Sequence, residues 1–466
     1  MATARAQTIE DVRYDLSFDV PATASEPVTA REVIHFRLKK VTQPLALDFA
    51  PGADFLTSVS VDGKPSQFRA VNGHIIIPEN ELTAGENTVE IAFRAGDASL
   101  NRNQEFLYTL FVPARAHLAF PCFDQPDLKA RYKMELTIPP GWESVANGAE
   151  LSRESSGDRT RVRYAETAPI PTYLFAFAAG KFQVETAERN ERTFRMFHRE
   201  TDAKKVARNR EAVFDLHASS LKWLEDYTAI PYPFGKFDFI LIPSFQFSGM
   251  EHPGAILYNA ASLLLDESAT ENQMLGRATT IAHETAHMWF GDLVTMRWFN
   301  DVWMKEVFAS FLAAKIVNPQ YPKVNHDLRF LISNYPSAYA VDRTGGSHPI
   351  RQELENLNEA GSLYDEIIYQ KAPIVMRQLE RVLGGEKRHH VRARHIRAKV
   401  DHEMTEVMFL ARADGAVGEK HERAAAAHES AHPMVRVDPG VHAGSQTARP
   451  NFLRRVSGEG DDRRTL

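Results

Sequence analysis

Polar and apolar residues alternate with a period of two along much of the first 190 residues. This alternation is typical of β-strands that turn one apolar face towards a core. Asp-Gly and Asn-Gly pairs, at 62–63 and 72–73, are turn signals that separate such segments. The pattern predicts an all-β region with strands at Tyr14–Val20, Val33–Leu38, His74–Ile77 and Thr88–Phe93.

Apolar residues recur at helical spacing after about residue 200. A turn signal at Gly291-Asp292 ends one helical pattern, and Asn300 or Asp301 is a suitable cap for the next. The short apolar run Phe237–Ile242, which precedes both of these signals, is typical of a buried strand. The pattern predicts helices at Lys204–Tyr227, Thr279–Phe290 and Asp301–Val317.

These patterns predict an α+β multidomain protein. We expect a β-rich domain over residues 1–190 and a mainly helical domain over 191–385. The last 81 residues, 386–466, differ in composition, with eight His, twelve Arg and twelve Ala but no Trp or Tyr. Large apolar residues are too sparse there to cover a core, so we expect an atypical tail that is mostly disordered.

The net charge of −6 over 466 residues is mild and gives no reason to expect a nucleic-acid partner. Cys122 is the only cysteine, so no internal disulfide can form. The first residues contain no apolar segment typical of a signal peptide, and no run of eighteen apolar residues occurs. We expect a cytoplasmic protein with no membrane span, or an exported one if an upstream signal is missing.

The strongest chemical signal is His283-Glu284-Thr285-Ala286-His287. Residues i and i+4 share one helix face, so both imidazoles point the same way. This HExxH pattern predicts two zinc ligands, with Glu284 beside them as a general base. Catalytic zinc usually has three protein ligands and one open position. Glu306, separated from His287 by eighteen residues and located in the next predicted helix, is the candidate for the third.

The pattern occurs a second time at His428–His432. Pro433 follows this copy at once and disfavours helix at the second histidine. No carboxylate stands at the corresponding position downstream, where the residue is Asn451. We interpret the second copy as a chance match.

Two stretches, HETAHMWFGDLVT at 283–295 and WFNDVWMKEVFASF at 298–311, resemble the aminopeptidase N family of zinc metallopeptidases. The segment FPCFDQPDLKA at 120–130 resembles another signature of that family and has a structural interpretation as a fixed loop. The resemblance, over roughly residues 10 to 385, implies an N-terminal β saddle followed by a thermolysin-like catalytic domain. It also implies one Zn²⁺ per chain, bound by His283, His287 and Glu306.

The resemblance implies substrate-binding residues as well. Ser248 to His252 resembles the family's GxMEN motif, in which Gly249, Met250 and Glu251 would contact substrate and Glu251 would bind its α-ammonium. Tyr369 stands where the family's tyrosine donates a hydrogen bond to the developing oxyanion. Simpler interpretations are a solvated loop acid for Glu251 and a core tyrosine for Tyr369.

The sequence also departs from the family. Leu110 and Val112 replace polar residues that help to bind the amine, and His252 replaces an Asn. Ala372 replaces a Gly after Tyr369, and Lys305 and Val307 replace an Asn and a Gly beside Glu306. Asp292 and Asp301 are weak candidates for orienting the histidines.

The most direct hypothesis is a zinc aminopeptidase that releases residues from peptides with a free N-terminus. Two alternatives stay open: a truncated remnant or binding module without turnover, and an enzyme that hydrolyses epoxides.

Overall fold

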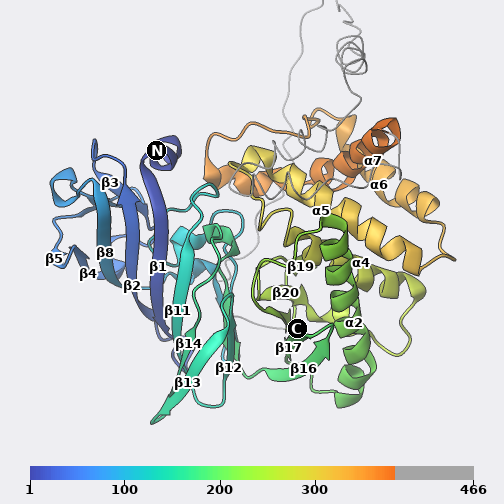
Figure 1. Ribbon diagram of the computed structural model, residues 1–466, viewed down its shortest axis with the longest axis horizontal. Coiled ribbons are helices and arrows are strands. Elements are labelled where there is room, and N and C mark those ends of the chain that lie inside the picture. Colours follow the sequence, from blue (N-terminus) through green and yellow to red (C-terminus); the bar gives the residue numbers. More distant parts are fainter. Residues whose placement is uncertain (384–466) are drawn as a thin grey trace, which may run out of the picture. The chain divides into compact units, whose positions relative to one another are not determined.

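The computed structural model describes residues 1–383 of the chain. The predicted tail over 386–466, including the second HExxH copy, lies outside the described residues. Strands dominate the first part and helices the second, as the sequence predicts (Figure 1). The predicted α+β multidomain fold class is thereby confirmed.

The N-terminal part is built around an eight-stranded sheet. In β1, buried and more exposed residues alternate, and the inward Tyr14, Leu16 and Phe18 are at most 2% exposed. Burying side chains of this size contributes roughly 1.5–3 kcal/mol each. The order is β13 (Glu150–Ser156), β14 (Arg159–Tyr164), β11 (Arg131–Ile138), β1 (Ile9–Asp19), β2 (Thr29–Leu38), β8 (Gly85–Arg94), β4 (Leu56–Val61) and β5 (Lys64–Pro65).

Two smaller sheets complete this part. Aromatic rings fill the space between elements: Tyr132 stacks on Tyr14 and on Phe175, with ring centroids 5.2 and 4.5 Å apart. One sheet has the order β12 (Glu143–Ala146), β15 (Phe177–Gly180), β10 (Phe106–Thr109) and β9 (Leu100–Arg102). The other has β3 (Leu45–Asp48), β7 (His74–Ile77) and β6 (Arg69–Val71).

A buried acid, Asp48, joins four segments of the N-terminal part. Arg5, from α1 (Ala2–Thr8), donates to both of its carboxylate oxygens at 2.7 Å. His74 of β7 lies 2.9 Å from Oδ1, and the backbone N–H of Asp124 donates to Oδ2 at 3.0 Å. Asp124 belongs to the loop at 120–130, so this loop is fastened to the sheet as its structural interpretation requires.

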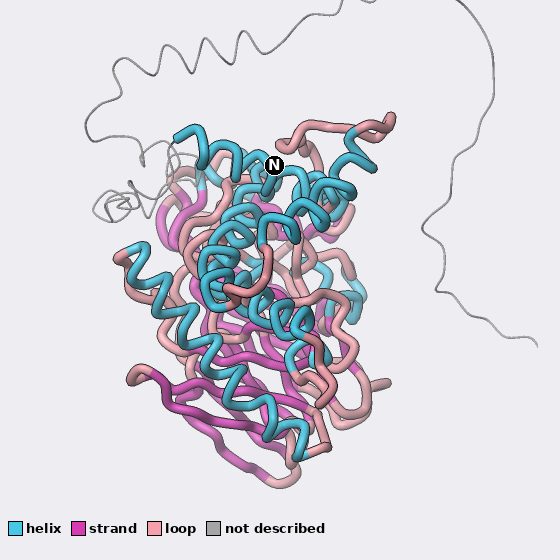
Figure 2. Tube along the Cα trace, turned by 90° about the vertical axis from the view of Figure 1, so that its right-hand side faces the viewer, coloured by secondary structure: helices cyan, strands magenta, loops and turns pink. Residues whose placement is uncertain are grey.

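The second part begins with a five-stranded sheet whose edge strand is β19. α2 (Ala203–Thr228) lies across this sheet (Figure 2), and its His217 stacks on Phe239 with centroids 4.1 Å apart. The order is β16 (Gln183–Arg189), β17 (Arg192–His198), β18 (Phe237–Ile242), β20 (Ile256–Asn259) and β19 (Gly249–Met250). The expected boundary at residue 190 falls in the β16–β17 hairpin, and the domain limits stay a prediction.

Two helices, α4 and α5, carry the HExxH stretch and Glu306, and they pack against each other. α4 (Glu271–His287) starts eight residues before the predicted Thr279. The reason is a capping box, in which Thr270 and Gln273 bond each other's backbone N–H groups. α5 (Val302–Val317) agrees with its prediction. The remaining helices are α3 (Ala260–Leu263), α6 (His326–Asp342) and α7 (Ala372–Leu383).

Candidate metal centre

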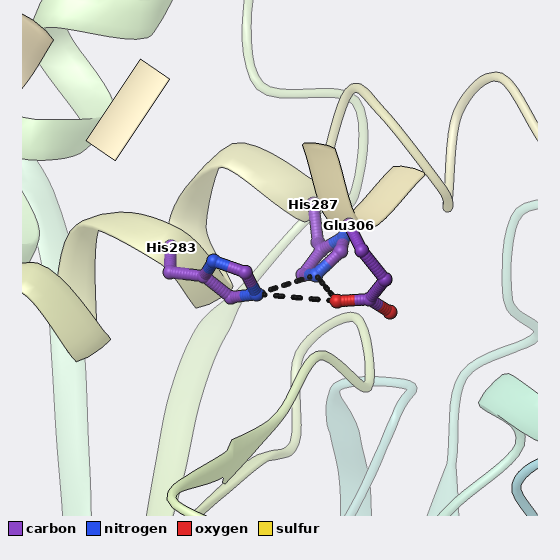
Figure 3. Close-up of side chains that lie close together, drawn as sticks. All are labelled: His283, His287 and Glu306. Carbon is purple, nitrogen blue, oxygen red and sulfur yellow. Dashed lines mark hydrogen bonds and ion pairs between the residues drawn. The ribbon is translucent and has the colours of Figure 1, made fainter. Parts of the chain in front are cut away.

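His283, His287 and Glu306 point towards a common centre (Figure 3). The two Nε2 atoms of the histidines lie 3.0 Å apart. Glu306 Oε2 lies 3.4 Å from Nε2 of His283 and 3.5 Å from Nε2 of His287. The structure therefore brings together the three residues that the sequence predicts as ligands.

The spacing of these atoms fits a zinc ion. Nitrogen and oxygen ligands bind zinc at about 2.0–2.1 Å, so two ligands of a tetrahedral ion lie about 3.3 Å apart. The three observed separations, 3.0, 3.4 and 3.5 Å, bracket this value. Two imidazoles and one carboxylate also leave a fourth position for water, as a catalytic zinc site requires.

Backbone and hydroxyl groups orient the two imidazoles. Nδ1 of His287 lies 3.0 Å from the carbonyl oxygen of Phe290, so Nδ1 carries the proton and Nε2 is free to bind a metal. Nδ1 of His283 lies 3.4 Å from Oγ of Ser310. The predicted candidates for this task were wrong: Asp301 pairs with Arg351, and the side-chain carboxylate of Asp292 has no hydrogen-bond partner among the described residues.

Burial and neighbouring charges shift the pKa values of the three predicted ligands in different directions. Burial lowers the pKa of His283, which favours the neutral form that binds metals. At His287, Glu251 and Glu306 outweigh burial and raise the pKa. At Glu306, burial alone would raise the pKa, but Lys305 and His287 lower it well below its ordinary value. Glu306 is therefore a carboxylate, the form that binds metals.

Glu284 lies beside the centre and is only 5% exposed. Burial, reinforced by Glu251 and Glu306, raises its pKa to about 8. Its carboxyl group lies against Gly249 of the edge strand, where any β-carbon would overlap it. A side chain at position 249 would therefore force the carboxyl group of Glu284 to move.

Glu251 follows the edge strand and is 4% exposed, so it is not a solvated loop acid. Nζ of Lys305 lies 2.6 Å from Oε1 of Glu251 and 2.6 Å from Oε1 of Glu306. Burial alone would raise the pKa of Glu251, but Lys305 more than offsets this and the pKa falls to about 2. A second set of possible metal ligands consists of Glu251, Glu284 and His287.

Lys305 is a neighbour of the candidate ligands whose position the sequence does not reveal. The comparison with the family marks it as a departure next to a ligand. Its side chain is 1% exposed and lies 5.8 Å from the ring centroids of Tyr173 and Tyr364. A lysine beside a glutamate on a helix is usually solvated, so only the tertiary structure shows that it bridges two carboxylates.

Tyr369 is not a core tyrosine, because it is 38% exposed. It lies in the single π-helical turn Ile367–Lys371 that precedes α7. Its ring centroid is 6.5 Å from that of Tyr364, which flanks Lys305. Tyr369 is thus partly exposed to solvent and lies next to the ring that flanks Lys305.

Three other departures from the family are buried. His252 is fully buried, and neither of its ring nitrogens has a hydrogen-bond partner among the described residues. Burial lowers its pKa to about 4, so it is neutral near pH 7. Leu110 and Val112 are 4% and 9% exposed and cannot hydrogen-bond an amine through their side chains.

The turn after α4 is held by the N-terminal part of the chain. Lys129, from the loop at 120–130, donates to the carbonyl oxygens of Asp292 and Leu293 at 3.0 and 2.9 Å. The hydroxyl of Tyr173 donates to the carbonyl oxygen of Gly291 at 3.3 Å. The same turn carries the Phe290 carbonyl that orients His287, so the β-rich part supports the site.

Two protein-family models match the chain. The peptidase M1 N-terminal domain matches residues 11–174, and the peptidase family M1 domain matches residues 213–413. The chain belongs to peptidase family M1. The resemblance to aminopeptidase N is thereby confirmed, and the second match contains all three predicted ligands of this M1 chain.

Curated relatives of this M1 chain carry aminopeptidase names. The puromycin-sensitive aminopeptidase of Caenorhabditis elegans is 33% identical over 62% of this chain and 30% of its own length. Aminopeptidase M1-A of Oryza sativa subsp. japonica is 33% identical over 67% of this chain and 37% of its own length. The leucyl aminopeptidase of Saccharolobus solfataricus is 31% identical over 60% of this chain and 35% of its own length. The chain thus spans well under half the length of these relatives.

None of its described helices is both long and apolar enough to cross a membrane.

Proposed function

We propose that this chain is a zinc aminopeptidase that hydrolyses the first peptide bond of peptides with a free N-terminus. The observation that carries the proposal is the convergence of three donor atoms at 3.0–3.5 Å with Glu284 beside them. One Zn²⁺ per chain would be bound by His283, His287 and Glu306. When bound, zinc would polarise the scissile carbonyl and lower the pKa of a bound water.

Glu284 is the general base in this proposal. As a carboxylate it accepts a proton from the attacking water and returns it to the leaving amine. Its burial beside Gly249 holds the carboxyl group in one place, because the strand and the helix are in contact there. The phenolic O–H of Tyr369 donates a hydrogen bond to the oxyanion that develops on the substrate, since a phenol is a neutral donor near pH 7.

The edge strand β19 and Glu251 align the substrate. The outer side of an edge strand has unpaired backbone groups, which can pair with an extended peptide. A peptide bound along Gly249 and Met250 would extend its N-terminus towards Glu251. This buried carboxylate favours a positively charged amine, so one residue is released at a time.

Hydrolysis of alanine, leucine and arginine p-nitroanilides by the purified chain tests the proposal. We expect turnover that is lost with a chelator, with Glu284→Gln and with N-acetylation of the substrate. Glu271→Gln, an exposed acid on the same helix, is the matched control and should retain full activity. Zinc content near one per chain without any turnover would show a binding module, and would refute the proposed enzyme.

A further inference from the structure

Lys305 places a primary ammonium group at the carboxylate proposed to receive the substrate's amine. Its Nζ lies 2.6 Å from Oε1 of Glu251 and 2.6 Å from Oε1 of Glu306, and its side chain is 1% exposed. Both contacts are charge-assisted hydrogen bonds of the short, strong kind. The lysine thus sits inside the candidate site and does not belong to the solvated face of α5.

The lysine and a peptide N-terminus present the same chemistry to Glu251. Each is a primary ammonium with three N–H donors and one positive charge. When Lys305 holds Oε1 of Glu251, an incoming ammonium meets a carboxylate whose charge is already neutralised. It also meets a second positive charge at close range, in a buried place where such repulsion is poorly screened.

Glu306 divides its two oxygens between the two sides of the site. Oε2 faces the histidines at 3.4 and 3.5 Å, whereas Oε1 accepts from Lys305. The contact of Lys305 with Glu306 therefore leaves the oxygen that faces the donor atoms free. This arrangement keeps the lysine near Glu251 without removing Glu306 from the metal centre.

We propose that Lys305 is a specificity-determining residue that occupies the amine subsite and competes with the substrate's α-ammonium for Glu251. This inference rests on the proposed function. It follows that the chain binds a free N-terminus more weakly than Glu251 would bind it without the lysine, while the amine still binds at this carboxylate.

A purely structural role for Lys305 makes a different prediction. If the lysine only separates two acids that would otherwise repel, removing its charge should weaken all ligands alike and reduce metal binding. If it competes for Glu251, removing its charge should strengthen only the ligands that carry an ammonium. The two roles therefore predict different changes in the ratio of affinities for two ligands that differ only in the presence of an ammonium group.

The first experiment compares leucine p-nitroanilide with 4-methylpentanoyl p-nitroanilide, which lacks only the amino group. In Lys305→Gln, which keeps an N–H donor but no charge, we expect KM for the amine substrate to fall at least about tenfold. KM for the amine-free substrate should stay within about twofold. Lys315→Gln is the matched control, because Lys315 lies on the same helix and pairs with Glu380 outside the site. An unchanged KM ratio in Lys305→Gln overturns the proposal.

The second experiment measures binding without turnover. Zinc-loaded Glu284→Gln protein is titrated with leucinamide by calorimetry, with and without Lys305→Gln, and zinc content is measured for each sample. Leucinamide should bind at least about tenfold more tightly when the lysine charge is absent. The gain should vanish when Glu251→Gln is added, since the competition is then removed. Unchanged or weaker leucinamide binding at equal zinc content overturns the proposal.

The two experiments separate this inference from the proposed function. Turnover with an unchanged KM ratio would refute the competition and leave the aminopeptidase intact. Tighter leucinamide binding without turnover in any variant that retains Glu284 would support the competition and refute the enzyme. Lys305→Asn, a shorter neutral residue, repeats both measurements in case the Gln variant folds poorly.

Discussion

Two buried acidic clusters in this chain differ in how their charges are balanced. In the N-terminal part, each oxygen of Asp48 accepts from two donors supplied by Arg5, His74 and the backbone of Asp124. In the second part, Glu251 and Glu306 share the ammonium of Lys305, and the buried Glu284 lies beside them without an ion pair among the described residues. The first cluster is complete, whereas the second contains more acids than its lysine can neutralise.

The pKa values of the two clusters reflect this difference. At Asp48, burial alone would raise the pKa, but hydrogen bonds from His74 and Arg5 lower it far below its ordinary value. At Glu284, burial dominates and raises the pKa to about 8. Acids that remain buried without enough protein cations are typical of sites that bind something else. We therefore expect the Asp48 cluster to stabilise the fold and, under the proposed function, the second cluster to bind metal and substrate.

The largest effect should come from Glu284→Gln. We expect kcat for leucine p-nitroanilide to fall on the order of 10²–10⁴-fold, because the general base is lost. The thermal midpoint should not fall, because the change removes a buried acid that has no stabilising cation of its own. Thermal unfolding and zinc content check this. A large loss of stability would contradict the contrast between the clusters.

Asp48→Asn should mainly reduce stability, whereas Glu284→Gln should mainly reduce activity. Removing this charge leaves Arg5 buried without its partner, so we expect the free energy of unfolding to fall by about 3–5 kcal/mol. Urea unfolding of the purified chain measures it. The exposed Asp54→Asn is the matched control and should change stability by less than about 0.5 kcal/mol. If both variants are equally stable, the Asp48 cluster does not support the fold.

Metal removal should destabilise the helical part by a smaller amount. Zinc at about 100 times its dissociation constant stabilises a folded site by roughly 2.7 kcal/mol, so chelation should lower the thermal midpoint. In Glu306→Gln the chelator should have little effect, because one of the three proposed ligands is weakened. Differential scanning fluorimetry with and without chelator checks this. An equal shift in wild type and variant would argue against Glu306 as a ligand.

The smallest expected effect is the loss of stability that acid causes by protonating Asp48. Because the folded pKa of Asp48 is depressed, its stabilisation is complete above the unfolded value near 4 and is lost as the pH falls towards the folded value. Below pH 4, Asp48 contributes up to about 1.4 kcal/mol per pH unit to the slope of stability. Asp48→Asn should flatten that slope. An identical slope in wild type and variant would exclude this contribution.

Much of the fold follows from local pattern. Alternation of apolar residues predicts the strand at 74–77 with its observed ends, a strand inside each of β2 and β8, and a strand that overlaps β1 and runs one residue past its end. The start of α4 was missed because the stretch before Thr279 contains Gly276 and polar residues, which obscure a helical face. The deciding signal was the capping box at Thr270 and Gln273, which can be read from sequence.

The sequence by itself determined the three predicted ligands and Glu284. Helical spacing places His283 and His287 on one face, and a neighbouring helix brings in Glu306. The tertiary structure alone decided where Lys305 lies, and which groups hold the turn after α4. Lys305 reaches Glu251 across 54 positions, and Lys129 reaches Asp292 across 163. Such contacts depend on the packing of distant segments and on burial, and neither leaves a periodic trace in the chain.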